Sequence, residues 1–208
     1  GQNRVGLITY MRTDSVRIAQ TALDEVRDWL SKEFPENLPP EPIHYAVGKS
    51  AQDAHECIRP TYPKYTPDYV KDYLTRDQLK LYTIIWERFV SSQMTNAKTA
   101  TTTVEIQAGE ALFRVSASKL IEKGFYSVIK VLSAKEEITG NLPSLKVGEI
   151  LEAAHEFYPE QHFTQGPARY TDASIVRMLE EKGIGRPSTY APIISVLLDR
   201  YYVVRNNR

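Results

Sequence analysis

The spacing of apolar residues changes twice along this chain of 208 residues, and the two changes divide it into three parts. Residues 1–95 place apolar side chains three and four positions apart, which is typical of amphipathic helices. Residues 96–160 are richer in β-branched side chains and turn signals, which predicts a β-rich segment. Helical spacing returns in residues 161–208. The sequence therefore predicts a mixed fold, mainly α with one β-rich segment, in three domains with these bounds.

The first part is expected to be a helical domain. It opens with a predicted strand over residues 4–11, whose side chains alternate between two faces. Asp14 or Ser15 can cap the next helix, predicted over residues 16–33. Two later helices are predicted to start at Thr66–Pro67 and at Thr75, and a glutamine three positions after Thr75 completes a capping box.

The middle part predicts three strands, over residues 101–106, 112–115 and 126–132, separated by glycine turns. The last part predicts two helices. The first covers residues 172–182 and is capped by Thr171, and the second runs to about residue 199.

A glycine turn joins these two helices. Gly183 is expected to end the first helix in left-handed geometry, and Ser188 or Thr189 to cap the second. A short strand over residues 201–204 would follow. Helix, glycine turn, helix and strand is the outline of a winged helix-turn-helix.

Composition excludes several classes of protein. The 26 Lys and Arg balance 26 Asp and Glu, so net charge does not indicate a nucleic-acid partner. Cys57 is the only cysteine, which excludes an internal disulfide and a cysteine-based metal site. No apolar run approaches the ~20 residues of a membrane span, and no signal peptide opens the chain. We therefore expect a cytoplasmic protein with no membrane partner. Because a predicted strand starts within a few residues of Gly1, we also expect a piece of something larger.

Tyr10 and Arg12 form the first candidate site. In an extended segment both side chains point the same way, so a phenol and a guanidinium share one patch just before a helix. A tyrosine of pKa about 10 needs such charge stabilisation to attack phosphorus. A helix N-terminus near Ser15 would add a seat for phosphate. The alternatives are a plain strand-to-helix junction with a half-buried Tyr10, and a surface ion pair of Arg12 with Asp14 or with a residue elsewhere.

His55 and Arg59 form the second candidate site. His55 could bind a phosphate oxygen or relay a proton, and Arg59 could clamp a phosphate with two hydrogen bonds. A zinc site is excluded, because no second histidine lies at a suitable spacing. The alternative is a structural histidine in a loop.

The third candidate site covers residues 183–190. Its two glycines allow close approach of the backbone, while Arg186, Ser188 and Thr189 offer donors to a nucleic-acid backbone. The alternative is a turn with ordinary helix capping.

These three strings resemble type IA DNA topoisomerases, in the order and at about the spacing of that family. They are residues 6–15 (GLITYMRTDS), 54–61 (AHECIRPT) and 183–190 (GIGRPSTY), and residues 167–170 (PARY) also fit. Met11 favours the bacterial topoisomerase I branch. The resemblance covers nearly the whole chain.

The resemblance implies roles for individual residues. Tyr10 would be the nucleophile that cuts one strand and holds its 5′ end as a phosphotyrosine, and Arg12 would assist cleavage. DNA contacts are implied for Thr13, Asp14, Ser15, His55, Arg59, Arg169, Arg186, Ser188 and Thr189. Residues 1–95 would be the winged-helix-like tyrosine domain, 96–160 part of a β-rich arch and 161–208 the helix-turn-helix beside the site.

The resemblance also implies that parts lie upstream. The TOPRIM domain of the family, with its acidic cluster and Mg²⁺, has no counterpart here, since no Asp-x-Asp-x-Glu string occurs. We therefore expect the chain not to relax supercoils alone. Its partners would be single-stranded or underwound DNA and the N-terminal part of the same protein, in the cytoplasm and at the nucleoid.

Three other readings stay open on the sequence. A non-catalytic module that binds single-stranded nucleic acid would use the helix-turn-helix end. A tyrosine recombinase would place its tyrosine after an Arg and His set, whereas Tyr10 comes first. In a purely structural domain every motif would serve capping and packing.

Overall fold

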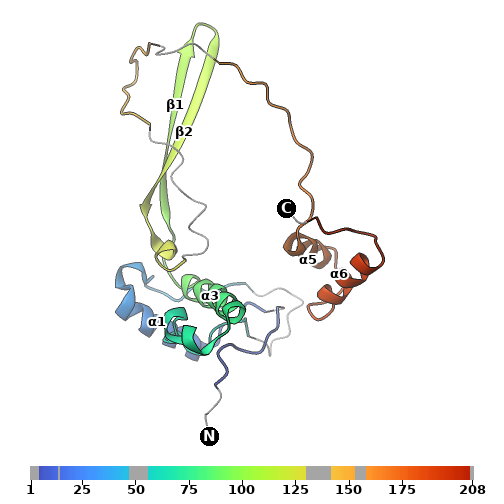
Figure 1. The fold of residues 1–208 in the computed structure, drawn as a ribbon. Helices are drawn as coiled ribbons and strands as arrows, with labels where there is room; N and C mark the ends of the chain where they lie inside the picture. Colours follow the sequence, from blue (N-terminus) through green and yellow to red (C-terminus); the bar gives the residue numbers. More distant parts are fainter. Residues whose placement is uncertain (1–4, 14, 47–55, 130–141, 153–157, 207–208) are drawn as a thin grey trace. The chain divides into compact units, whose positions relative to one another are not determined.

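The chain forms two compact units, Gly1–Ser144 and Leu145–Arg208 (Figure 1). The computed structural model describes residues 5–13, 15–46, 56–129, 142–152 and 158–206. Within them the fold is mixed, with helices and one two-stranded antiparallel sheet, which agrees with the predicted class. The division into three domains stays a prediction.

Helix α1 (Gln20–Glu33) begins four residues later than predicted. The Arg17 carbonyl accepts a hydrogen bond of 2.8 Å from the Cys57 N–H, so it does not bond within the helix. Ser15 does not cap α1, because its hydroxyl accepts from the Arg17 N–H at 3.2 Å in a local turn. Ala19 occupies the N-cap position without a side-chain bond. A tertiary contact therefore decides where this helix starts.

Threonines cap the two helices that follow, as predicted. Thr66 accepts from the Tyr69 N–H at the start of the short helix α2, and Thr75 and Gln78 exchange hydrogen bonds in a capping box before α3. The bounds are η1 (Pro35–Asn37), α2 (Pro67–Val70), η2 (Lys71–Tyr73) and α3 (Arg76–Ser91), where η denotes a 3₁₀ turn.

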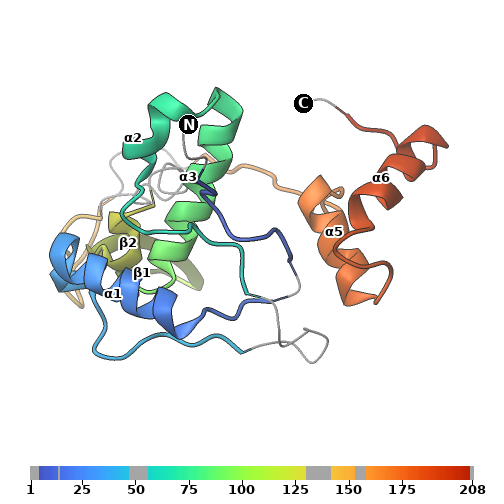
Figure 2. The ribbon, with the colours of Figure 1, turned by 90° about the horizontal axis from the view of Figure 1, so that it is seen from below.

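The core of the first unit joins the apolar faces of α1 and α3, which lie in one helical body (Figure 2). Val26, Leu30 and Val90 are fully buried. Trp29 meets Trp86 edge to face, with ring centroids 5.4 Å apart. Burial of each large apolar side chain stabilises the fold by roughly 1.5–3 kcal/mol, so this seam holds the unit together.

The segment before α2 is tied to α3 by two side chains. The Tyr82 hydroxyl donates to the Tyr65 carbonyl at 2.5 Å, and the Trp86 indole N–H donates to the Pro63 carbonyl at 2.8 Å. Burial, with a smaller contribution from Tyr65, raises the pKa of Tyr82 to about 12. These bonds fix the chain just after Arg59.

Two of the three predicted middle strands are confirmed as a long hairpin, β1 (Lys98–Ala108) and β2 (Ala111–Glu122). The strands pair antiparallel around a turn in which Gly109 has φ +61°. Hydroxyl pairs such as Thr101 with Ser118, at 2.9 Å, cross the hairpin.

The third strand, predicted over residues 126–132, is wrong for its described part. The chain forms a 3₁₀ turn, η3 (Gly124–Ser127), and then buries Val128 and Ile129. Gly124 has φ +48°, and the Phe125 N–H donates to the Thr95 carbonyl at 2.9 Å. The β-branched run fills the core here and pairs with no strand among the described residues; residues 130–132 lie outside them.

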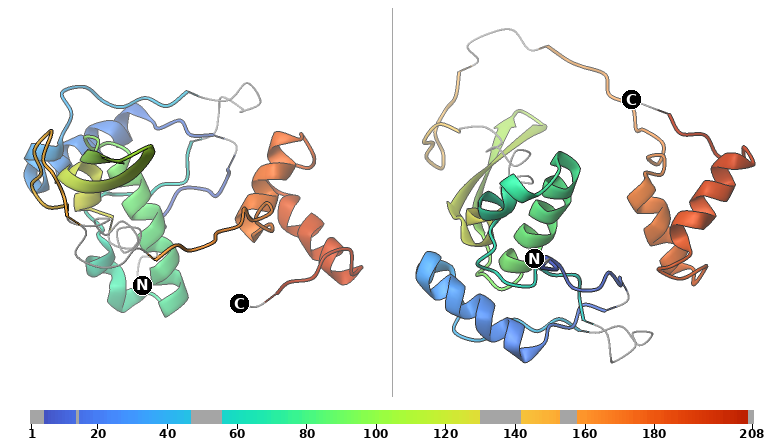
Figure 3. Two further views of the ribbon diagram at one scale, coloured as in Figure 1. Left: turned by 90° about the horizontal axis from the view of Figure 1, so that it is seen from above. Right: turned by 60° about the horizontal axis from the view of Figure 1, so that its bottom comes forward.

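The second unit holds the two predicted helices, α5 (Asp172–Glu181) and α6 (Tyr190–Asp199), joined by a tight turn (Figure 3). Thr171 caps α5 as predicted, and Gly183 ends it at φ +67°. Thr189 is the N-cap residue of α6 but makes no capping bond.

The strand predicted over residues 201–204 is not formed. Tyr201 takes φ +58°, and the Tyr202 N–H donates back to the Leu197 carbonyl at 3.0 Å. A strand needs a partner, and residues 145–208, where described, contain no other strand.

Candidate active site

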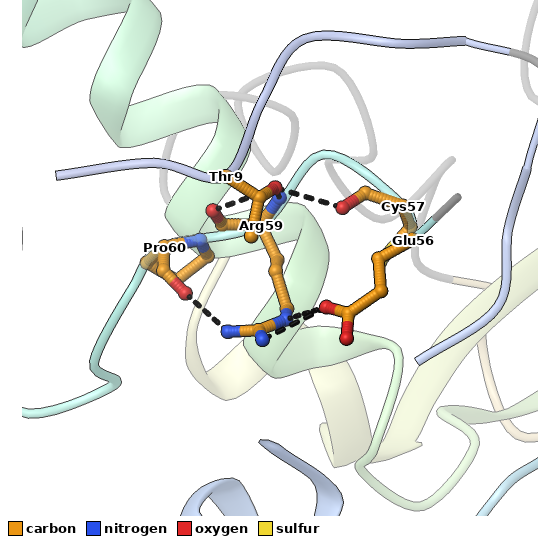
Figure 4. Close-up of polar contacts among 5 residues, drawn as sticks. All are labelled: Thr9, Glu56, Cys57, Arg59 and Pro60. Carbon is orange, nitrogen blue, oxygen red and sulfur yellow. Dashed lines mark hydrogen bonds and ion pairs between the residues drawn. The ribbon is translucent and has the colours of Figure 1, made fainter. Parts of the chain in front are cut away.

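Two segments about fifty residues apart in the sequence lie side by side in the first unit (Figure 4). The Thr9 N–H donates to the Arg59 carbonyl, and the Thr61 N–H donates to the Leu7 carbonyl, both at 2.9 Å. The strand predicted over residues 4–11 reduces, in the part that the structure describes, to one bridge between Ile8 and Pro60. The Arg59 N–H donates to the Thr9 hydroxyl instead of the Thr9 carbonyl, so the regular ladder does not extend past Thr9. The pairing nevertheless joins the Tyr10 motif to the Arg59 motif.

The side chain of Thr9 reinforces this pairing. Its hydroxyl donates to the Cys57 carbonyl at 2.9 Å and accepts from the Arg59 N–H at 3.1 Å. Thr9 is the residue next to Tyr10, so these bonds fix the backbone at the candidate nucleophile. Sequence reasoning missed this role, because the partners of Thr9 are about fifty positions away.

Tyr10 is open to solvent, with 78% of its surface exposed, so the half-buried alternative is wrong. The Arg12 guanidinium carbon lies 5.8 Å from the centre of the Tyr10 ring. A cation beside an exposed phenol suits an attack on phosphorus, because it can stabilise the negative charge that develops. Met11 and Thr13 are exposed as well, while Asp14, the alternative partner of Arg12, lies outside the described residues.

The predicted phosphate seat at a helix N-terminus near Ser15 is wrong. The helix starts at Gln20, and Ser15 itself is buried with its hydroxyl bonded to the Arg17 N–H. Backbone N–H groups of α1 are therefore not placed next to Ser15.

Arg59 is bound within the protein. Its Nε and Nη2 atoms contact Glu56 Oε2 at 2.9 and 2.8 Å, and Nη1 donates to the Pro60 carbonyl at 3.1 Å. The side chain is only 13% exposed. A phosphate that binds the edge formed by Nε and Nη2 would have to replace the Glu56 carboxylate there. His55, the predicted neighbour, lies outside the described residues.

Cys57, whose carbonyl accepts the hydrogen bond from Thr9, carries a neutral thiol. Burial is the largest influence on its pKa and raises it; Arg59 opposes the shift, and Glu56 adds to it. A thiol kept protonated in this way is a poor nucleophile and metal ligand.

An open depression of about 620 Å³ borders the paired segments. Arg59, Thr9 and Thr61 contribute from the pairing, Glu25 from α1 and Tyr62 from the chain beyond Thr61. The lining mixes charge, hydroxyls and one aromatic ring. Sequence reasoning did not single out Tyr62.

The third candidate site lies in the second unit. Arg186, Ser188 and Thr189 are exposed on the turn before α6, and Arg169 is exposed ahead of α5. The Thr189 hydroxyl accepts from the Arg186 N–H at 2.8 Å, which closes the turn.

Gly185 makes this turn possible. It has φ +78°, and a Cβ there would lie 2.8 Å from the Ile193 side chain. The donors of this turn are thus held by a backbone shape that glycine alone adopts easily.

Among the described residues no group of three or more His, Cys, Asp or Glu side chains could hold a metal ion. None of the helices that the structure describes is long and apolar enough to cross a membrane.

Comparison with known proteins matches the whole chain. The family model described as DNA topoisomerase covers residues 3–208. DNA topoisomerase 1 of Treponema pallidum (strain Nichols) is 60% identical over 205 residues, which are 99% of this chain and 28% of that protein. DNA topoisomerase 1 of Xylella fastidiosa (strain Temecula1 / ATCC 700964) is 44% identical over 215 residues, 100% of this chain and 26% of that protein.

A solved structure agrees with the sequence comparisons. The full-length topoisomerase I of Thermotoga maritima matches with a TM-score of 0.74 and 35% identity, over 98% of this chain and 32% of that one. The chain therefore spans between a quarter and a third of the length of these relatives. An exposed Tyr10 beside Arg12, paired to the Arg59 segment, and a family match over residues 3–208 lead to one conclusion: the chain belongs to the DNA topoisomerase family, as its motifs indicate.

Proposed function

We propose that this chain carries the nucleophile of a bacterial topoisomerase I, which cuts and rejoins one DNA strand and so relaxes negative supercoils in the full-length protein. The Tyr10 phenolic oxygen attacks a backbone phosphorus. A bond forms between that oxygen and phosphorus, the bond from phosphorus to the 3′ oxygen breaks, and the phenolic proton leaves. The 5′ end stays on Tyr10 as a phosphotyrosine while the 3′ oxygen takes up a proton.

Rejoining is the reverse reaction. The 3′ hydroxyl attacks the phosphotyrosine and Tyr10 is released. One phosphodiester is exchanged for another, so the cycle needs no external energy source. Arg12 stabilises the charge on the phosphate oxygens as it builds in the transition state.

One observation carries the proposal. The hydrogen-bonded pairing of residues 7–9 with residues 59–61 presents an exposed Tyr10, with Arg12 beside it, next to the segment of Arg59. Thr13, Asp14, Ser15, His55 and Arg59 belong to the proposed DNA contacts around it.

The second unit supplies the remaining proposed contacts, from Arg169, Arg186, Ser188 and Thr189. We propose that the second unit binds the DNA backbone. Exposed hydrogen-bond donors on a turn that depends on glycine suit phosphate groups and give no base specificity. The same proposal includes three further points. Residues 1–95 and 161–208 resemble winged helices, residues 96–160 form part of an arch, and the protein lies at the nucleoid.

Magnesium enters only as a cofactor of the full-length protein. We place it in the TOPRIM domain that the family resemblance implies, and no step above is routed through a metal.

The test is covalent trapping in the full-length protein with single-stranded DNA. Tyr10→Phe removes the phenolic oxygen and keeps the ring. We expect denaturing gels to show no protein–DNA adduct for this variant, while binding of the same strand is retained. A trapped peptide that maps to another residue contradicts the proposal.

The same experiment decides the second candidate, a non-catalytic module that binds single strands. An adduct that is unchanged in Tyr10→Phe would favour that module, since the exposed turn of the second unit could bind DNA without chemistry at Tyr10.

A further inference from the structure

We propose that Tyr62, Lys64, Tyr65 and Tyr69 form a stacking platform for the bases of a single DNA strand, beside the candidate active site. The inference rests on the proposed function, because single-stranded DNA is the substrate of that function. It adds a site to the three motifs, since none of these four residues belongs to them.

The three rings form a continuous ladder. Tyr62 meets Tyr65 edge to face, with centroids 5.4 Å apart and planes at 79°. Tyr65 lies parallel to Tyr69, with centroids 5.5 Å apart and planes at 7°. Tyr65 is half-buried between its neighbours, whereas Tyr62 is 39% and Tyr69 63% exposed. The two ends of the ladder therefore keep aromatic surface available to a base.

A cation accompanies the rings. The Lys64 ammonium lies 5.4 Å from the Tyr62 centroid and 5.7 Å from the Tyr65 centroid. Aromatic rings that stack bases, beside a cation that contacts the backbone, are the recurring parts of sites for single-stranded nucleic acid.

The ladder is held in place by the core. The Tyr82 hydroxyl bonds to the Tyr65 carbonyl and the Trp86 indole bonds to the Pro63 carbonyl, so buried residues of α3 fix the backbone between the rings. A platform set in this way loses little further conformational freedom when it binds.

The ladder also begins at the candidate active site. Tyr62 lines the open depression together with Arg59 and Thr61, and Thr61 is hydrogen-bonded to Leu7, three residues before Tyr10. A strand whose phosphate lies at Tyr10 would thus have aromatic surface on the neighbouring segment for its flanking bases.

The decisive measurement compares two probes on this 208-residue chain, a fluorescent twelve-nucleotide thymidine strand and an abasic strand of equal length, by anisotropy. Both probes carry the same phosphates, so only the first reports stacking. We expect the chain to prefer the thymidine strand. Tyr62→Ala and Tyr69→Ala should each weaken thymidine binding at least about fivefold and leave abasic binding within about twofold.

Three further variants separate stacking from charge and from misfolding. Tyr69→Phe keeps the ring and should bind as the unchanged chain does. Tyr73→Ala removes an exposed tyrosine that is no rung of the ladder and should also have no effect. Lys64→Gln should weaken binding to both probes and reduce the salt slope by about 0.7.

The proposal of a stacking platform would be contradicted if both alanine variants bound the thymidine strand within twofold of the unchanged chain. Equal binding of the two probes by the unchanged chain would also contradict it. If the same variants instead reduced association with a separately supplied upstream part of the protein, the rings would be a protein contact. Tyr10→Phe should keep the preference for bases. The covalent trapping experiment therefore tests only the assignment of Tyr10 as the nucleophile. The anisotropy measurement tests only the stacking platform.

Discussion

At the scale of single residues, Thr9 connects Tyr10, the proposed nucleophile, to its surroundings. Tyr10 is exposed and has little packing of its own, so its position depends on the backbone before it. That backbone is held by the Thr9 N–H and by the hydrogen bonds of the Thr9 hydroxyl to the Cys57 carbonyl and the Arg59 N–H. Thr9 is accordingly a positioning residue, since it acts through Tyr10.

Thr9→Val removes the hydroxyl and keeps the branched shape. Each lost hydrogen bond is worth about 1 kcal/mol, so we expect the full-length protein to form the covalent adduct roughly tenfold more slowly. Thr9→Ser should restore the rate. Thr61→Val is the matched control, because its hydroxyl bonds to the Gly6 carbonyl at 2.6 Å, farther from Tyr10. An equal loss in both valine variants would show that the pairing as a whole matters and Thr9 in particular does not.

Tyr82 gives the first unit a dependence on alkaline pH. Because its pKa is about 12 in the fold against about 10 when unfolded, its contribution is complete below pH 10 and is lost as pH rises toward 12. Tyr82→Phe cannot ionise but leaves the Tyr65 carbonyl without its donor. We expect this variant to be less stable by about 1 kcal/mol at neutral pH, with the difference narrowing between pH 10 and 12. Urea unfolding followed by tryptophan fluorescence measures both, and a constant difference would contradict the assignment.

At the scale of elements, the hairpin depends on the turn at its base. Gly124 has φ +48°, and a Cβ there would lie 2.5 Å from the backbone of Asn96 and Thr95. The Asn37 carbonyl accepts from the Thr95 N–H at 2.8 Å, so the same turn ties β1 and β2 to the helical body.

Gly124→Ala should therefore reduce the free energy of unfolding by about 3 kcal/mol or more, because backbone atoms have to move. Gly109→Ala is the control. Gly109 also has positive φ, +61°, but nothing lies within 4 Å of its Cβ position, so a loss of only about 1 kcal/mol is expected. Thermal unfolding of the two variants tests the difference, and equal losses would mean that the crowding at Gly124 is relieved at little cost.

At the scale of the whole molecule, the chain holds candidate DNA contacts on two separate units. Neither α5 nor α6 buries a residue, whereas α1 and α3 share a packed core. The chain spans 28% of the length of its Treponema relative, and we propose that the complete reaction needs protein beyond these 208 residues.

We expect the 208-residue chain not to relax supercoiled plasmid with added magnesium, and to form a covalent adduct with single-stranded DNA when the upstream part of the protein is supplied separately. Agarose gels follow relaxation, and denaturing gels follow the adduct. Clear relaxation by the chain alone would contradict the proposed division of the activity.

Much of the local structure was predictable from neighbouring residues. Thr75 with Gln78, and Thr171 before α5, cap helices because their partners lie three positions away. The hairpin followed from β-branched runs around Gly109. Predictions failed where a distant group decided, as at the start of α1, where Cys57 bonds to the Arg17 carbonyl.

The candidate site divides in the same way. The sequence alone determined which groups the site contains, a tyrosine with an arginine two positions on in a topoisomerase motif, because those groups lie within one short string. Only the tertiary structure decided that Tyr10 is exposed, that Thr9 joins it to the Arg59 segment, that Glu56 binds the Arg59 guanidinium and that three tyrosine rings contact one another beside them. Contacts between segments some fifty residues apart depend on how the whole chain folds. The spacing of neighbouring residues does not determine them.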